Sequence, residues 1–303
     1  MIEVQPAELD YVLITPARNE AALIEHPLRS VIAQTMPPQR WIIVSDSSSD
    51  GTDDLVKVHA KTHPFITLVR RQASQERNFA SKVEAIRLAL KHMPDRPADL
   101  LGFLDADVSF APFYFEEVLK MFALDARLGI AGGQYYEEHG GRWRPVPTAA
   151  DWSVTGGVQM FRTQCYSEIG GYIPRERGGI DTVAEVMARQ RGWKVRTNTA
   201  LVVHHHRRMG LANQGVLRAR FLEGWQEYTI GYDPAFAVLK SFRRVTQRPW
   251  AIGSISRICG FFSALVTTSR PTVPDSMVSF LRAEQRKRLI GQLTPPESRK
   301  GAK

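Results

Sequence analysis

Two aspartates one residue apart, Asp105 and Asp107, follow the apolar segment LLGFL at residues 100–104. Carboxylates at the end of a buried strand suit Mg²⁺ or Mn²⁺, which take few protein ligands and complete their shell with water and phosphate oxygens. A cation held there would neutralise charge on a departing diphosphate. The tripeptide alone is more typical of a solvated or structural pair, and its position after the apolar segment is what favours a metal site.

Polar residues also follow two other apolar segments that we expect to be strands. They form PARNE at residues 16–20 and DSSSDG at 46–51. In an open α/β sheet, ligands bind at the carboxyl ends of the strands, so these residues and Asp105–Asp107 are candidates for one site. The chain contains neither Gly-x-Gly-x-x-Gly nor Gly-x-x-x-x-Gly-Lys-Ser/Thr, which argues against a classical dinucleotide site and a P-loop.

The elements that must position these residues alternate along the first third of the chain. We expect strands at 11–15, 41–45, 66–70 and 100–104, and helices at 21–35, 52–63 and 77–92. This alternation predicts an α/β fold with a mostly parallel central sheet and helices on both faces. Pro16 is expected to end the first strand, because proline cannot donate to a sheet ladder.

The pattern changes after about residue 110. We expect a helix at 112–124, a strand at 130–136, a loop at 137–151, a strand at 156–162, a helix at 182–192 and a strand at 193–203. Further helices are expected at 211–229, 234–245 and 275–290. Side chains alternate along a strand, so His204 and His206 after the last strand would face one way and His205 the other.

Charge is distributed unevenly over the 303 residues. The formal net charge is +9, yet residues 204–303 hold 17 Lys and Arg against 6 Asp and Glu, which leaves residues 1–203 near neutral. A basic region of this kind predicts an anionic partner, either nucleic acid or a membrane surface. Cys165 and Cys259 supply neither a disulfide framework nor a zinc site. The first residues lack the basic start and apolar run of a signal peptide.

An apolar stretch at residues 250–268 lies within the basic region. Arg257 interrupts it, and a membrane-spanning helix needs about 20 predominantly apolar residues. We therefore favour an interfacial segment, a re-entrant segment or a buried helix over a spanning one. Trp250 and neighbouring arginines are typical of an anchor on anionic lipid. The alternative is a C-terminal helical subdomain with solvated arginines.

Five segments occur in a characteristic order: TPARNE, VSDSSSDGT, FLDADV, GGVQMFR…CYSEIGGY and GIDTVAEVMARQRGW. In this order and spacing, residues 10–210 resemble the family 2 glycosyltransferases of GT-A fold, which are inverting enzymes of polysaccharide biosynthesis. The resemblance implies a catalytic domain at 1–210, with a nucleotide-binding half to about 110 and an acceptor half at 111–210. Residues 211–303 would form a separate basic helical region.

The resemblance also implies roles for individual residues. Asp181 would be the catalytic base, Asp105 would contact the ribose or base, Asp107 would bind the metal, and His204 or His206 would approach the metal and diphosphate. Thr15, Pro16, Arg18 and Glu20 would line the nucleotide pocket, with Asp46 accepting a hydrogen bond from the base and Lys82 near the nucleotide. Trp152, Gly156 and Gly157 would shape the acceptor and donor-sugar pocket, and the alternative for Trp152 is a core residue. Apart from the resemblance, Glu76, Arg77 and Asn78 lie at the start of the helix expected at 77–92 and are either capping and surface residues or residues that reach the donor.

Two positions depart from the family pattern. Ile180 stands where the family commonly has Glu before the aspartate, and Met187 stands where it commonly has Arg. The spacing from Asp181 to Gly192 and Trp193 still matches, which supports Asp181. The competing interpretation makes Asp181 the N-cap of the following helix.

The sequence thus predicts an inverting, metal-dependent glycosyltransferase at the cytoplasmic face of a membrane. It would move a sugar from a nucleotide diphosphate, expected to be UDP, to a hydroxyl of a glycan or lipid-linked glycan. The alternatives are a sugar-phosphate nucleotidyltransferase, which lacks its usual Gly-rich loop here, and a nucleic-acid-binding protein, for which no recognition motif is present. We therefore expect no nucleic acid partner.

Overall fold

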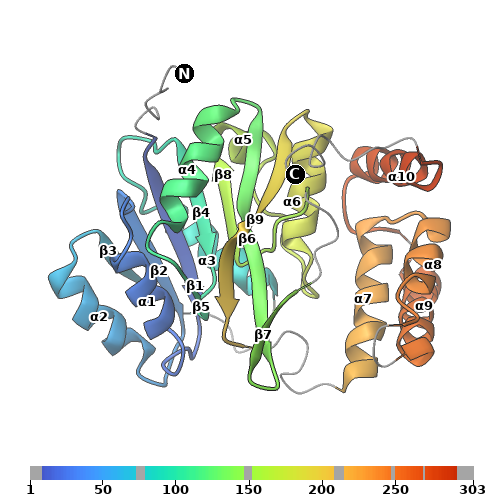
Figure 1. The fold of residues 1–303 in the computed structure, drawn as a ribbon, viewed down its shortest axis with the longest axis horizontal. Coiled ribbons are helices and arrows are strands. Elements are labelled where there is room, and N and C mark those ends of the chain that lie inside the picture. The colour runs from blue at the N-terminus through green and yellow to red at the C-terminus, as the bar shows by residue number, and fades with distance from the viewer. Residues whose placement is uncertain are drawn as a thin grey trace, which may run out of the picture. The chain divides into compact units, whose positions relative to one another are not determined.

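The computed structural model describes residues 9–72, 79–146, 152–207, 215–246, 250–268 and 270–291. The chain forms two compact units, residues 1–208 and 209–303. Figure 1 shows the N-terminal unit as a sheet covered by helices, and the C-terminal unit as helices alone. The predicted α/β class with a C-terminal helical region is confirmed.

Nine strands form one sheet in the described part of the N-terminal unit. They are β1 (Tyr11–Ala17), β2 (Arg40–Asp46), β3 (Ile66–Arg71), β4 (Leu100–Leu104), β5 (Val108–Phe110), β6 (Leu128–His139), β7 (Arg142–Pro145), β8 (Val158–Arg162) and β9 (Lys194–His205). The strand order is β3-β2-β1-β4-β8-β6-β9-β5, with β7 paired to β6.

The first half of the sheet is parallel, as the β-α alternation predicts. Strands β3, β2, β1 and β4 pair in parallel. The helices α1 (Glu25–Ile32), α2 (Thr52–Thr62) and α3 (Phe79–Leu90) connect these strands along the chain. Each strand is a short apolar run, and Trp41, Ile43 and Leu13 are almost completely buried in the core beneath the helices. Parallel pairing brings the carboxyl ends of β1, β2 and β4 to one edge, so the polar residues after them meet there.

The second half of the sheet is mixed, so "mostly parallel" describes only the first half. Strand β8 runs antiparallel between β4 and β6, and β5 runs antiparallel to β9. The helices that follow are α4 (Tyr114–Leu124), α5 (Thr163–Glu168) and α6 (Ile180–Gln190). The insertion of β8 brings the segment just before it, which holds Gly156 and Gly157, beside the aspartate turn after β4.

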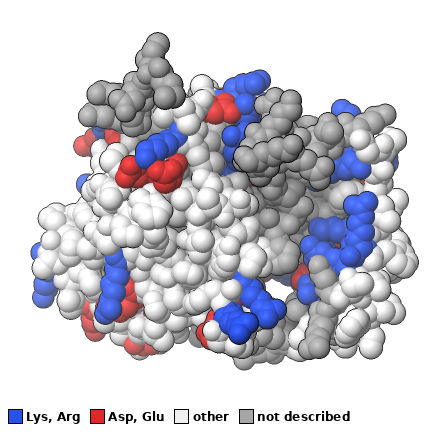
Figure 2. All heavy atoms as spheres, viewed as in Figure 1, with Lys and Arg blue, Asp and Glu red and all other residues white. Residues whose placement is uncertain are grey.

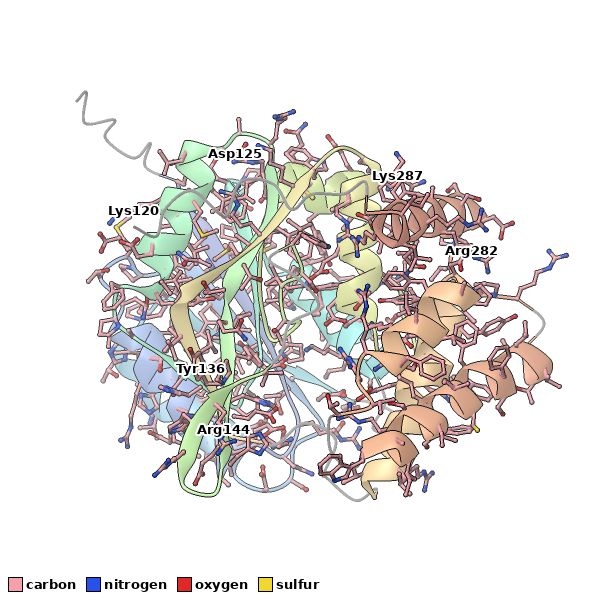
Figure 3. All side chains as sticks on the ribbon, turned by 45° about the vertical axis from the view of Figure 1, so that its right-hand side comes forward. Lys120, Asp125, Tyr136, Arg144, Arg282 and Lys287 are labelled. Carbon is pink, nitrogen blue, oxygen red and sulfur yellow. The ribbon has the colours of Figure 1, made fainter. Side chains whose placement is uncertain are left out.

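Three local expectations were wrong. Strand β1 continues through Pro16, which the structure tolerates because β4 pairs with β1 only as far as Ile14. The expected loop at 137–151 begins instead as a hairpin of β6 and β7, with Gly140 and Gly141 at positive φ in its turn. The structure describes this hairpin as far as residue 146, and Figure 3 labels Tyr136 and Arg144 on it. Helix α1 begins only at Glu25, after a turn over residues 21–24.

The C-terminal unit contains four described helices. They are α7 (Val216–Ile230), α8 (Pro234–Phe242), α9 (Trp250–Thr267) and α10 (Asp275–Leu289). Its small apolar core is made of Tyr228, Ala237, Phe261 and Ala264. In the described part of the chain, α9 alone has the length and hydropathy of a membrane-crossing helix; its mean hydropathy is 1.3, and a third of it is buried. A single helix of this kind is weak evidence for a membrane span.

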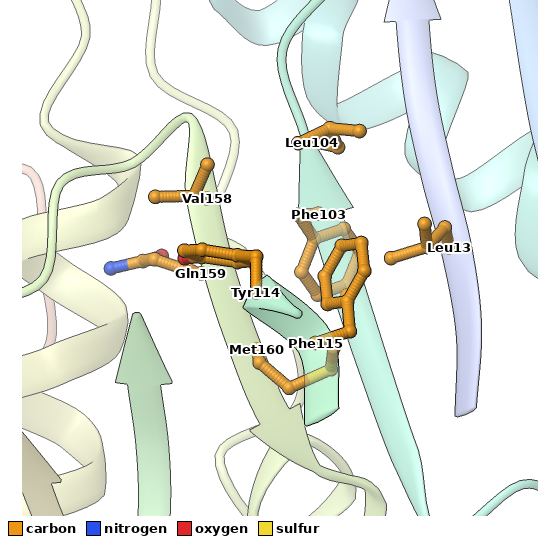
Figure 4. A pocket seen from close by; sticks show the side chains of 9 residues that line it. Leu13, Phe103, Leu104, Tyr114, Phe115, Val158, Gln159 and Met160 are labelled. Carbon is orange, nitrogen blue, oxygen red and sulfur yellow. The ribbon is translucent and has the colours of Figure 1, made fainter. Parts of the chain in front are cut away.

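A small cavity of about 10 Å³ lies in the core of the N-terminal unit. It is enclosed by apolar side chains of β1, β4, α4 and β8, including Leu13, Phe103, Phe115 and Met160 (Figure 4). This volume holds one water molecule at most. None of the predicted site residues lines it, so it is a packing defect.

Candidate active site

The turn between β4 and β5 carries both predicted aspartates. Its first carboxylate, Asp105, accepts a hydrogen bond from Lys82 Nζ at 2.5 Å, and its backbone N–H donates to Gly157 O at 2.9 Å. Burial by itself lowers the pKa of Lys82, but Asp105, then Asp181 and Asp107, raise it above its usual value. Lys82 therefore stays protonated and places a positive charge among three carboxylates.

Two glycines fill the space between Asp105 and Asp181. A Cβ atom on Gly156 would lie 2.8 Å from Asp181 Oδ2, and a Cβ atom on Gly157 would collide with Asp105 Oδ2 and the hydroxyl of Tyr135. Only glycine fits so close to both carboxylates. The structure thus brings Asp105, Asp181, Gly156 and Gly157 into one site, although Asp181 is 76 residues beyond Asp105 in the chain.

Asp181 lies in the first turn of α6. The helix begins at Ile180 and its N-cap is Gly179, with φ of +76°, so the alternative that Asp181 is the N-cap is wrong. Burial raises the pKa of the Asp181 carboxyl above its usual value, while the backbone of Thr182 and the charge of Lys82 oppose the rise. A partly desolvated carboxylate of this kind is a stronger base than an exposed aspartate and is suited to accept a proton.

Asp107 occupies a second cluster behind the turn. Its Oδ2 lies 3.5 Å from Arg207 Nε, and Arg207 donates two hydrogen bonds to the buried Glu20. Asp107 Oδ1 lies 3.5 Å from His205 Nε2, and His205 Nδ1 is 3.2 Å from Glu137. Burial tends to raise the pKa of Asp107, but His205 and Arg207 hold it below its usual value. Asp107 is therefore ionised.

One oxygen of this carboxylate fits a metal. Asp107 Oδ1 is buried and accepts no hydrogen bond from any described residue. Among the residues that the structure describes, no group of three or more His, Cys, Asp and Glu is arranged to hold an ion. A cation on Asp107 would thus depend on water and diphosphate oxygens for most of its shell, which is how Mg²⁺ is usually held.

The three histidines are placed by the alternation of β9. His205 shares the buried face with Leu201 and Val203 and contacts Asp107. His204 packs on Trp143, with ring centroids 4.4 Å apart, and His206 stacks on His26 and lies 2.8 Å from Ser109 Oγ. The metal role of His204 or His206 stays a prediction, and His205 is the histidine that the structure places beside Asp107.

The nucleotide pocket was predicted at the ends of β1 and β2. Asp46 accepts hydrogen bonds from Arg71 at 2.8 Å and Ser81 at 3.0 Å, and Arg18 approaches it to 4.0 Å. Thr15 is fully buried and accepts a hydrogen bond from the Trp41 indole at 2.9 Å, so its side chain packs in the core. Pro16 is half-buried at the end of β1.

The segment before β8 is fixed to α6 by Glu185. This carboxyl accepts hydrogen bonds from Val154 N at 2.6 Å and Gln159 Nε2 at 3.2 Å. Burial raises the pKa of Glu185 to about 8, although Arg189 opposes the rise. Trp152, at the start of the same segment, is half-buried. The candidates at 76–78 lie outside the described residues.

Sequence reasoning missed His205, Arg207, Glu137 and Tyr135. His205 could have been found, because Val203 two residues earlier is apolar and marks the buried face of the strand. Arg207 follows the three histidines and could have been considered with them. No local pattern marked Glu137 or Tyr135 as a site residue, since Glu137 was placed in the expected loop and Tyr135 in the strand just before it.

The sequence profile of the family described as glycosyl transferase family 2 matches residues 12–211, about two-thirds of the chain. The chain is a family 2 glycosyltransferase. The match covers every predicted site residue, from Thr15 to His206. It favours this assignment over the nucleotidyltransferase alternative.

Three proteins that resemble this glycosyltransferase share little sequence with it. The uncharacterized glycosyltransferase YibD of Escherichia coli K12 is 26% identical over 142 residues, which cover 45% of this chain and 38% of the length of YibD. The mannosyltransferase PcManGT from Pyrobaculum calidifontis, solved with GDP-Man and Mn²⁺, has a TM-score of 0.56 at 18% identity, covering 96% of this chain and 78% of that one. The S. aureus TarS 1–349 structure with UDP-GlcNAc has a TM-score of 0.53 at 13% identity, covering 94% and 80%. At such identities the structures show the shared GT-A fold alone.

Proposed function

We propose that this glycosyltransferase inverts the anomeric centre of a nucleotide-diphosphate sugar by direct displacement, with Asp181 as general base. The observation that carries the proposal is the position of Asp181 and Asp105 on either side of Gly156 and Gly157. A sugar bound against these two glycines would have the Asp181 base on one side and the diphosphate, near Asp105 and Asp107, on the other. Displacement from the face opposite the leaving group inverts the configuration.

The acceptor hydroxyl gives its proton to the Asp181 carboxylate while its oxygen forms a bond to the anomeric carbon. The bond from that carbon to the phosphate oxygen breaks, and its electron pair leaves with the nucleoside diphosphate. The raised pKa of Asp181 makes it a stronger base than an exposed aspartate. Glu185 acts as a positioning residue, because it fixes the glycine segment against the helix that carries Asp181.

The leaving diphosphate needs positive charge. A Mg²⁺ or Mn²⁺ ion on Asp107, when bound, would act as a Lewis acid on the diphosphate oxygens. Lys82 adds a fixed positive charge beside Asp105. Arg207, which lies between Glu20 and Asp107, adds a second. Charges held rigidly in this way stabilise the departing group without reorganisation during the reaction.

The donor we propose is a UDP-sugar, and the acceptor is a hydroxyl of a glycan or lipid-linked glycan at the cytoplasmic face of a membrane. The TarS structure was solved with UDP-GlcNAc, which supports the choice of UDP, whereas PcManGT was solved with GDP-Man. A thermal-shift screen of UDP, GDP and their sugars, with and without Mn²⁺ or Mg²⁺, tests the donor, because ligand binding raises apparent stability.

Two single substitutions test the site once a donor is known. Asp181→Asn should lower kcat by roughly 10²–10⁴-fold while leaving the donor-induced thermal shift intact, because it removes only the base. Asp107→Asn should abolish the metal-dependent part of that shift. Asp54→Asn, an exposed aspartate of α2, is the matched control.

Full transfer activity in folded Asp181→Asn and Asp107→Asn proteins would refute the site assignment. NMR analysis of the product's anomeric configuration tests inversion separately. A product that retains the donor's configuration would overturn the displacement mechanism.

A further inference from the structure

Helix α9 buries a charged side chain and exposes several apolar ones, unlike an ordinary surface helix of a water-soluble protein. Its buried face carries small residues and Arg257 beside the core residue Phe261, and its exposed face is apolar. The buried face consists of Gly253, Ser254, Arg257, Gly260, Phe261 and Ala264. The opposite face carries Ile252, Ile255 and Phe262, whose side chains are 61%, 58% and 41% exposed. Their spacing of three and then seven residues places them on one side of the helix.

The buried face is stabilised by an ion network. Arg257, only 5% exposed, donates to Glu227 Oε2 at 3.0 Å and to Glu223 Oε2 at 3.2 Å, both on α7. Lys240 of α8 donates to Glu227 at 2.8 Å. The charge of Arg257 is therefore satisfied inside the unit, and the apolar side chains of α9 are left on its surface.

Helices α7 and α9 meet backbone to backbone. A Cβ atom on Gly224 would collide with the Arg257 carbonyl, and one on Gly260 would collide with the Phe221 carbonyl. Contacts through small residues with polar groups inside the pair, and apolar side chains outside it, are typical of helices in a lipid environment.

Exposed apolar side chains also lie on the two helices that pack against α9. Ser256 Oγ donates to Leu217 O at 2.7 Å, and Ser254 Oγ donates to Ser241 O at 2.8 Å. These bonds hold α7 and α8 against α9, and both Leu217 of α7 and Phe242, which follows Ser241 at the end of α8, are exposed. We define the α9 surface as Leu217, Phe242, Ile252, Ile255, Phe262 and Val266.

Basic residues adjoin this surface in the chain. Arg218 and Arg243 directly follow Leu217 and Phe242, and Arg270 follows the end of α9. All three are exposed, and none forms an ion pair with a residue in the described ranges. Figure 2 shows basic side chains over the C-terminal helices with few acidic atoms between them, and Figure 3 labels Arg282 and Lys287 on α10.

We propose that the α9 surface docks on an anionic phospholipid bilayer, with α9 lying in the headgroup region. Arginines around an apolar face favour anionic lipid and would repel each other across an interface with a second copy of this chain. The opposite face of α9 is buried against α7 and α8, so the helix presents one apolar side to a surface. This arrangement fits an interfacial helix rather than a spanning one.

Flotation of the full chain with vesicles tests the proposal. The protein should float with phosphatidylglycerol–phosphatidylcholine vesicles and much less with phosphatidylcholine alone. Ile255→Asp or Phe262→Asp should each weaken partitioning about tenfold or more, since an apolar side chain of this size gains more than 1.4 kcal/mol on leaving water. Val58→Asp is the matched control, because Val58 of α2 is 61% exposed on the catalytic unit.

Circular dichroism and the donor-induced thermal shift verify that each variant is folded. Because the thermal shift reports donor binding in the catalytic unit, a failure of membrane binding can be distinguished from a failure of the proposed reaction. No flotation of the wild-type chain, or equal flotation of the α9 variants and Val58→Asp, would overturn the proposal. A wild-type dimer in light scattering that the α9 substitutions dissociate, without flotation, would instead show that a second copy covers the surface.

Discussion

Gly156→Ala is the sharpest perturbation of the proposed catalytic geometry. The added methyl group would lie 2.8 Å from Asp181 Oδ2 and 2.9 Å from Asp181 Cβ, whereas ordinary contacts begin at 3.4 Å. Because Asp181 is fixed in the first turn of α6, the carboxylate and the glycine segment must move apart by several tenths of an ångström. The nucleotide residues at the ends of β1 and β2 are not touched.

Misplacement of a catalytic group by about 1 Å costs up to about 10²-fold in rate, so we expect kcat to fall by roughly 10- to 10²-fold. This loss corresponds to about 1.4–2.7 kcal/mol of transition-state stabilisation. The KM for the donor should change little. The assay is steady-state release of the nucleoside diphosphate, with the melting temperature measured in parallel.

Gly215→Ala is the matched control, because a Cβ atom there meets no other atom within 4 Å and its φ is −57°. The control should keep wild-type kcat and KM. A Gly156→Ala protein that folds and turns over at the wild-type rate would refute the geometry. So would a loss that appears only in the KM for the donor.

Two further predictions concern buried charge. The pKa of Glu185 is raised from 4.5 to about 8, so between these pH values the folded state holds a proton that the unfolded state has lost, and the free energy of unfolding should fall as pH rises. Glu185→Gln should make the melting temperature fall less steeply with pH over this range. An unchanged slope in the variant would contradict the raised pKa. Arg257→Met should lower the unfolding free energy, measured by urea denaturation, by about 1.5–3 kcal/mol, because it removes one of the two cations, Arg257 and Lys240, that pair with the buried carboxylate of Glu227. Arg243→Met, which replaces an exposed arginine, should cost little by comparison, and equal losses would argue against a buried network.

Local sequence patterns predicted most of the elements. Short apolar runs predicted β2, β3 and β4 within one residue of their observed bounds. Strands β2 and β4 are buried on both faces of the sheet, β3 is partly buried, and each apolar run ends at polar residues. The β6–β7 hairpin was missed, since all four residues of β7 are exposed and Trp143 is its one large apolar side chain. The rule that excludes proline applies to strands paired on both sides, whereas beyond Ile14 strand β1 is paired with β2 and no longer with β4.

The sequence alone determined the family, the positions of most strands along the chain and the carboxylates that follow them, because these depend on runs and spacings of neighbouring residues. Only the tertiary structure decided which side chains meet. Arg207 pairs with Glu20 across 187 residues, and the insertion of β8 places Gly156 beside Asp181. It also decided that α9 buries Arg257 and exposes its isoleucines, since the partner of a buried charge can come from any part of the chain that packing brings near it.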